Sequence, residues 1–177
     1  MDAITLLIDA ASRPTDAARA TLRALDPDVA NLPVPGRNGT QANSSAWLVW
    51  HAARQQDAQV SALAGTEQVW VSGAWAARLG VHRGPDEIGF GDSPERVAAL
   101  RIEEPAVLLA YVIAVTDATL AYLRTLEASD LDDIVDASWE PPVTRGARLI
   151  STIDDAVAHL GQAEYARGLL THWSVGY

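Results

Sequence analysis

The chain contains no cysteine among its 177 residues, so it forms no disulfide bonds and offers no thiolate ligand to a metal. Any bound metal ion is therefore held by nitrogen and oxygen atoms. Runs of β-branched or aromatic residues are also scarce, whereas alanine and leucine are abundant. This composition favours helices over sheets.

Positive charge is in short supply as well. The chain has 13 lysines and arginines against 23 aspartates and glutamates, which gives a net charge of -10 and a pI of about 4.6. Such a surface repels phosphate backbones, and the basic residues mostly stand singly. We therefore expect no binding to nucleic acids.

The sequence shows no sign of export or membrane insertion. The first residues include Asp2 and Asp9 and lack a basic leader before their apolar stretch, which argues against a signal peptide. No apolar run approaches the roughly 20 residues that a membrane span needs. We expect a cytoplasmic protein that does not bind membranes.

Apolar residues recur at helical spacing along four long segments. Hydrophobic residues make up 49% of the chain, which is enough for a folded core. The predicted helices cover residues 3–25, about 44–64, a stretch that begins between 93 and 105 and ends near 126, and 147–172. The fold class is therefore all-α, a four-helix bundle formed by a single domain over residues 1–177.

Prolines and glycines mark the expected interruptions. Pro14 removes a backbone donor, so we expect a kink or break in the first helix near Ser12. Residues 26–43 hold several prolines and glycines and are predicted to form a loop. Gly65 is expected to end the second helix, and a short extra helix is predicted around Trp70, Trp75 and Leu79, before the third helix.

Two ionisable residues on the last predicted helix are placed among small and apolar ones. Asp155 and His159 lie four residues apart, so their side chains project to the same side. A carboxylate in such surroundings needs a compensating partner, and a metal ion supplies one. A third ligand must come from another helix, and His51, flanked by tryptophans, is the best candidate. Two imidazoles and one carboxylate with an open position are typical of a catalytic metal site.

Other interpretations of these residues stay open on spacing alone. A histidine beside tryptophans is commonly a hydrogen-bonded core residue, and Asp155 with His159 can form a surface pair. His82 and His172 are expected to be solvated. The tryptophans at positions 47, 50, 70 and 75 are expected to form core and pocket walls.

The order of several segments resembles the DinB/YfiT-like superfamily over nearly the whole chain. The resemblance is carried by NSSAWLVWHAARQQD, QVWVSGAW, GFGDSPERVAALR and WEPPVTRGARLISTIDDAVAHLGQAEYARGLL. It is closest to the branch related to the metal-binding domain of mycothiol-dependent maleylpyruvate isomerases. That resemblance implies a four-helix bundle with a divalent metal, zinc or nickel, held by three side chains.

The resemblance also implies which residues act. The ligand of the second helix falls on His51, and the paired ligands of the last helix fall on Asp155 and His159. Many relatives have histidine where this chain has Asp155, which lowers the charge of the site by one. Arg54 is a candidate for binding a thiol cosubstrate, or else pairs with Asp57 at the surface. Gln162 is a candidate for holding a water or a ligand beside the metal ligands, or else forms an interhelical hydrogen bond.

The family role implied is a metal-dependent transfer or isomerisation reaction that uses a small thiol such as mycothiol or bacillithiol, on an unknown substrate. The resemblance also implies a homodimer. The alternative is a non-catalytic helical bundle that binds a small ligand or a protein partner and has a degenerate metal site.

Overall fold

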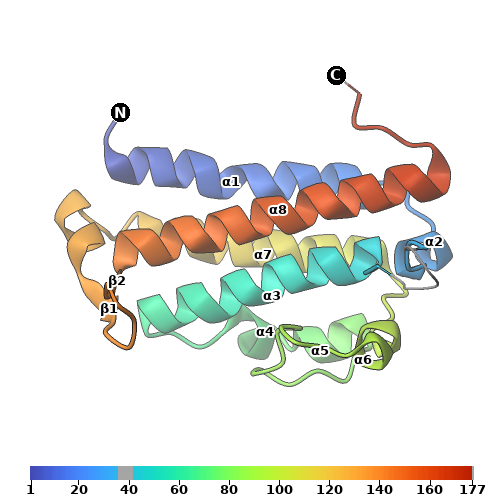
Figure 1. The fold of residues 1–177 in the computed structure, drawn as a ribbon, viewed down its shortest axis with the longest axis horizontal. Coiled ribbons are helices and arrows are strands. Elements are labelled where there is room, and N and C mark those ends of the chain that lie inside the picture. Colours follow the sequence, from blue (N-terminus) through green and yellow to red (C-terminus); the bar gives the residue numbers. More distant parts are fainter. Residues whose placement is uncertain (36–41, 177) are drawn as a thin grey trace.

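The computed structural model describes residues 1–35 and 42–176, and it confirms the predicted all-α bundle. Four long helices form the body of the molecule (Figure 1). They are α1 (Ala3–Leu22), α3 (Ser45–Ala64), α7 (Pro105–Leu123) and α8 (Arg145–Thr171). Each of the four therefore corresponds to one of the four helices expected from the apolar spacing.

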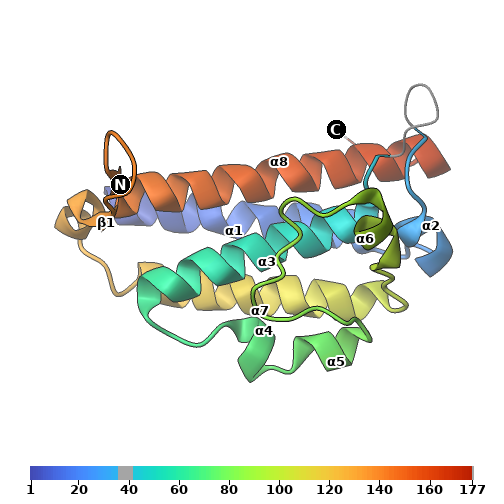
Figure 2. The same cartoon turned by 60° about the horizontal axis from the view of Figure 1, so that its bottom comes forward.

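The long helices pack as a closed four-sided bundle. Both α1 and α3 pack against α7 and α8, so α1 and α3 lie at opposite corners. The chain runs in one direction along α1 and α8 and in the other along α3 and α7 (Figure 1). Because α3 and α7 are parallel, the chain between them must cross back along the bundle, and residues 65–104 form this long connection (Figure 2).

Large aromatic and aliphatic side chains fill the centre of the bundle. Trp50, Leu108 and Tyr111 are fully buried there, and Trp47, Trp70 and Trp75 are at most 5% exposed. A second buried cluster lies where α1 and α8 begin and α7 ends. It contains Leu7, Ala11, Leu123 and Leu149. The prediction that the four tryptophans belong to the core is therefore confirmed.

Side chains and glycine set the ends of α3. The hydroxyl of Ser44 accepts a hydrogen bond from the Trp47 backbone N–H, as an N-cap does. At the other end Gly65 adopts a left-handed conformation with φ of 65°, which favours glycine. Both boundaries agree with the expectation from the sequence.

The first helix differs from the expectation because α1 passes through Pro14 without a break. Pro14 is buried, and α1 packs along its length against α7 and α8. This packing offsets the one backbone hydrogen bond that proline removes. The helix ends at Leu22, before Leu25, because Ala24 has a φ of 51° that is incompatible with its continuation.

The connections contain more structure than expected. The predicted loop 26–43 holds the short helix α2 (Pro27–Asn31), and the extra helix before α7 is two helices, α4 (Val69–Ser72) and α5 (Trp75–Leu79), followed by α6 (Pro94–Ala99). The acidic connection before α8 holds a 3₁₀ helix, η2 (Ala128–Asp132). It also holds two antiparallel strands, β1 (Ile134–Asp136) and β2 (Val143–Thr144), where none was expected.

The length and composition of α7 correct one further expectation. An 18-residue window of this 19-residue helix has a mean hydropathy of 1.9, which is enough for a membrane span by length and composition alone. Its Tyr111, Thr116 and Thr119 are nevertheless buried among the other helices. The contacts of α7 with α1 and α3 account for the buried part of this helix, which is 39% of that window.

Candidate metal centre

Three residues that are far apart in the sequence meet between α3 and α8. His51 comes from α3, and Asp155 and His159 come from α8. One ligand atom from each residue lies within 4.8 Å of the ligand atoms of the other two. The structure therefore brings together all three predicted metal ligands.

Small side chains on α8 allow α3 to come close at this point. Thr152, Ala156 and Ala163 are buried against α3. Two hydrogen bonds join the helices directly, from the Ser45 hydroxyl to the Ala163 carbonyl and from the Gln55 amide to the Thr152 carbonyl, each 3.0 Å long. These contacts fix the distance between His51 and the pair on α8.

The His51 ring is oriented by its surroundings on two sides. Its Nδ1 lies 2.5 Å from the carbonyl oxygen of Ile88, and its ring stacks on Trp47 at 4.8 Å between centroids. With Nδ1–H donating to that carbonyl, Nε2 keeps its lone pair. Burial lowers the pKa of His51, which favours the neutral imidazole that a metal needs.

His159 has a similar arrangement but a different charge balance. Its Nδ1 lies 3.1 Å from Gln162 Oε1, and its Nε2 lies 3.5 Å from Asp155 Oδ1. The ring meets that of His51 edge-on, with 4.6 Å between centroids. The Asp155 carboxylate raises the pKa of His159. Gln162 therefore contacts a residue of its own helix, and it is placed to hold Nδ1 while Nε2 faces Asp155.

Asp155 supplies the observation that best fits a metal ion. Its Oδ2 atom is buried and makes no hydrogen bond to any residue that the structure describes. A buried carboxylate oxygen without a partner is costly, and a cation would compensate it. Ligands about 2.1 Å from an ion lie no more than about 4.2 Å apart, so the three donors, which lie within 4.8 Å of one another, must move closer together to bind one ion.

Comparisons with known proteins identify the family. The model of the DinB superfamily matches residues 10–163. The chain belongs to the DinB superfamily. A solved structure of a conserved protein from Enterococcus faecalis is similar, with 32% sequence identity, a TM-score of 0.86, and coverage of 98% of this chain and 99% of that one. No curated protein matches. The maleylpyruvate isomerase branch stays a prediction.

A glycine loop completes the site of this DinB-superfamily chain, and its role was not expected from the sequence. Gly89 has a φ of 95°, and a Cβ atom there would lie 2.9 to 3.0 Å from Trp50, His51 Nδ1 and Trp47. The loop therefore rests directly on the ligand ring and presents the Ile88 carbonyl to it. The glycine-rich segment was visible in the sequence, but nothing in the sequence indicates which backbone carbonyl meets a side chain.

A buried ion pair holds that loop in place. Arg83 and Asp92 lie 2.8 Å apart, with 6% and 7% of their side chains exposed. Arg83 also donates a hydrogen bond to the carbonyl oxygen of Arg96 in α6, the helix that follows the loop. The two ends of the loop are thereby fixed near Trp50, over which the Arg83 guanidinium lies.

Arg54 is paired with Asp57, as one of the two interpretations had it, but the pair is buried and not at the surface. The guanidinium also contacts Tyr111 and Gln68 and lies over the Trp70 ring. None of the Arg54 side chain is exposed, and its role in binding a thiol cosubstrate stays a prediction.

Proposed function

We propose that this protein binds one divalent transition metal ion through His51, Asp155 and His159. The observation that carries the proposal is the convergence of two imidazoles, each held at Nδ1 by an oxygen, with a buried and unpartnered carboxylate oxygen. The ligands would be the two Nε2 atoms and the Asp155 carboxylate. Nitrogen and oxygen ligands of this kind suit zinc or nickel.

The reaction proposed for this centre is transfer or isomerisation with a small thiol of the mycothiol type as cosubstrate. A bound divalent ion lowers the pKa of a thiol or water that coordinates it and so supplies a nucleophile near neutral pH. Three protein ligands leave a position for such a molecule. The side chains of Asp155 and His159 are 39% and 22% exposed, so solvent reaches this side of the site.

Gln162 links the centre to a neighbouring pocket of about 340 Å³. While its Oε1 holds His159, its side chain also lines this pocket, whose other walls are largely apolar: Val34, Leu48, Tyr165, Ala166 and Leu169. We assign this pocket to the substrate. The proposed location of the reaction is the cytoplasm.

Metal analysis of protein purified without a histidine tag tests the proposal. The unaltered chain should carry or take up about one equivalent of zinc or nickel, whereas His51→Ala should retain less than about a tenth of it. His82→Ala is the matched control, because His82 is exposed and lies outside the site. Equal metal content in the two variants would exclude the site.

The alternative is a non-catalytic bundle with a degenerate site. It is favoured by the contact between Asp155 and His159, which forms an ion pair without any metal when His159 is protonated. The same His51→Ala variant separates the two functions. Loss of thiol-dependent turnover supports the enzyme, whereas loss of metal with unchanged binding of a ligand or partner supports the binding module.

A further inference from the structure

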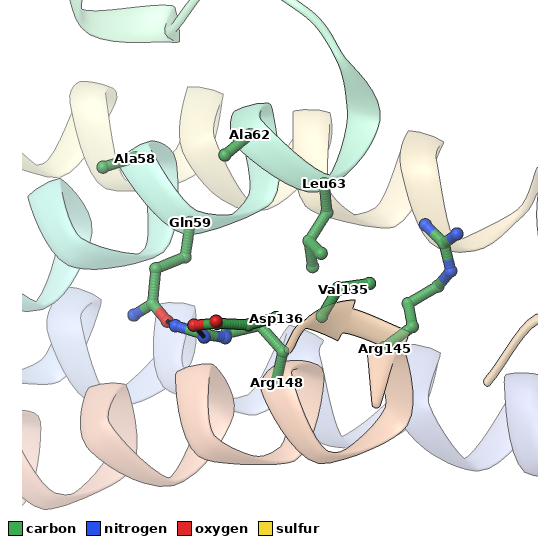
Figure 3. Close-up of a pocket in the computed structure, with 8 residues that line it drawn as sticks. All are labelled: Ala58, Gln59, Ala62, Leu63, Val135, Asp136, Arg145 and Arg148. Atoms are coloured by element: carbon green, nitrogen blue, oxygen red, sulfur yellow. Dashed lines mark hydrogen bonds and ion pairs between the residues drawn. The ribbon is translucent and has the colours of Figure 1, made fainter. Parts of the chain in front are cut away.

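A second hollow opens between the end of α3, the β1–β2 hairpin and the first turn of α8 (Figure 3). Its volume is about 490 Å³, within the range of sites that bind small organic molecules. The lining residues are Ala58, Gln59, Ala62, Leu63, Val135, Asp136, Arg145 and Arg148. No part of the proposed metal function uses this pocket.

The pocket is separate from the metal centre although both lie between α3 and α8. Arg148 precedes Asp155 by seven residues, about 10 Å along the helix axis. Between the two sites, the Gln55 amide donates to the Thr152 carbonyl, and Gln59 donates to Gln55. These side chains close the space between the helices, so a ligand in the pocket does not contact the metal ligands.

The walls of the pocket differ in polarity. Leu63 and Val135, with two alanines of α3, form an apolar wall. Gln59, Asp136 and Arg148 converge on the other side (Figure 3). Such a hollow suits a molecule with an apolar body and one polar end.

The two arginines of the pocket are engaged to different degrees. Arg145 uses all three of its nitrogens, donating to the Asp130 carbonyl, the Tyr122 hydroxyl and the Asp133 carboxylate. Its guanidinium points away from the polar group formed by Gln59, Asp136 and Arg148 (Figure 3). We therefore regard Arg145 as an anchor of the segment around η2.

The Arg148 guanidinium does not use all of its hydrogen-bond donors. It makes one hydrogen bond of 3.1 Å to Asp136 and a long one of 3.5 Å to Gln59. Its side chain is 30% exposed, and its Nε–H makes no hydrogen bond within the part of the chain that the structure describes. A guanidinium with free N–H groups at the wall of a hollow is suited to a planar carboxylate.

The position of Arg148 strengthens the preference for an anion. The first turn of α8 has no acidic residue and contains Arg145, while Arg148 follows directly. A helix N-terminus already carries partial positive charge, and proteins usually place acidic residues there. Asp133 and Asp136 pair with these two arginines, so the preference for a negative ligand comes from the helix N-terminus and from the donors of Arg148 that remain free.

We propose that this pocket binds a small organic carboxylate with an apolar body. The carboxylate occupies the free donors of Arg148, and the body lies against Leu63 and Val135. Asp136 competes with the ligand for the same guanidinium. This competition distinguishes an anion site from a merely structural ion pair. Removing the Asp136 charge should strengthen ligand binding at an anion site, whereas it should not do so if the ion pair is only structural.

Titration with hexanoate, followed by ¹H–¹⁵N NMR, tests the proposal. Hexanoate should shift the amide signals of residues 58–63, 135–136 and 145–148, and hexanamide should bind at least about tenfold more weakly. Arg148→Gln should weaken hexanoate binding by about tenfold or more, and Asp136→Asn should strengthen it several-fold. Arg13→Gln, which removes an exposed arginine of α1, is the matched control and should leave the affinity unchanged.

Asp136→Asn is expected to bind hexanoate more strongly than the unaltered chain. A variant that unfolds cannot produce this result. Equal affinity for hexanoate and hexanamide would overturn the proposal, and so would weaker hexanoate binding by a folded Asp136→Asn variant. The titration is repeated with His51→Ala, whose hexanoate affinity should match that of the unaltered chain. Failure of hexanoate binding can thus be distinguished from failure of the proposed metal site.

Discussion

At the scale of single residues, Gly89 is the position where backbone conformation and the metal centre meet. Its φ of 95° disfavours any side chain, and an added Cβ would press on His51 and both neighbouring tryptophans. We expect Gly89→Ala to displace the Ile88 carbonyl from His51. The unfolding free energy should fall by about 1–3 kcal/mol and the affinity for zinc should fall with it. Urea denaturation and a zinc titration with a chromophoric competitor measure the two effects.

Gly91 provides the control for this substitution. Its φ of 74° carries a similar backbone penalty, but a Cβ there meets nothing within 4 Å. Gly91→Ala should therefore lose stability only and keep the zinc affinity of the unaltered chain. If both variants lose zinc equally, the contact between Gly89 and His51 is not what positions the ligand.

The pKa values of the two histidines of the centre are shifted in opposite directions. Burial lowers the pKa of His51, whereas the Asp155 carboxylate raises the pKa of His159. In the metal-free protein, the stabilisation from protonated His159 is present below its unfolded pKa of about 6.5 and is lost as the pH rises through its raised folded pKa. For His51 the folded state loses stability as the pH falls below about 6.5.

The pH dependence of the metal affinity should be set by His159, the ligand that protonates first as the pH falls. Because a metal requires the neutral imidazole, zinc affinity should decline as the pH falls through the raised pKa of His159, by about tenfold per pH unit below it. Competition titrations between about pH 8 and pH 5 measure this slope. An affinity that does not change over this range would show that His159 is not a ligand.

At the scale of elements, Asp57 ties α3 to α4 and α7. Its carboxylate accepts hydrogen bonds from the Val69 and Trp70 backbone N–H groups at the start of α4, from the Tyr111 hydroxyl and from Arg54. Asp57→Ala leaves the Arg54 charge buried without its partner. We expect it to lower the unfolding free energy by about 3–5 kcal/mol, measured by urea denaturation.

Asp9→Ala is the control for the buried pair. Asp9 pairs with Arg13 at the surface of α1, where the two side chains are 49% and 74% exposed. Its loss should cost no more than about 1 kcal/mol. Equal costs for the two variants would mean that burial does not strengthen the network around Arg54.

The elements also show what the sequence reveals and what it hides. The long helices were predictable because apolar residues recur at helical spacing over many turns, although α7 is apolar around most of its circumference. The short helix α2 was missed although Asp26 and Pro27 form a typical start, with the Asp26 side chain accepting from Asp28 N–H. The strands β1 and β2 have three and two residues, too few for an alternating pattern to emerge.

The candidate site was predictable only in part. The spacing of Asp155 and His159 placed them on one side of a helix, and the family resemblance added His51. The Ile88 carbonyl was not predictable because it belongs to the backbone of a loop. The burial of Arg54 was hidden because its sequence neighbour Asp57 is an equally good partner at a surface or in a core. The single-domain organisation stays a prediction.

At the scale of the whole molecule, the apolar residues on the outside of α8 bear on assembly. Ile150 and Val157 are 56% and 51% exposed and lie seven residues apart, so they share a helix face. Gly161, four residues further, is exposed on the same face and allows close approach of another helix. Together with the dimer implied by the family resemblance, this face leads us to propose that two copies pair through α8.

The paired state should respond to charge in a predictable way. Each copy carries a net charge of -10, so two copies repel one another and raised salt should favour the dimer. Light scattering should give about twice the chain mass of 18.9 kDa, and Val157→Glu should return it to one copy. Val71→Glu, at a valine of α4 that is 44% exposed, is the control and should leave the dimer intact. A single-copy mass for the unaltered chain at high salt would refute the pairing, because screening then leaves no repulsion to explain it.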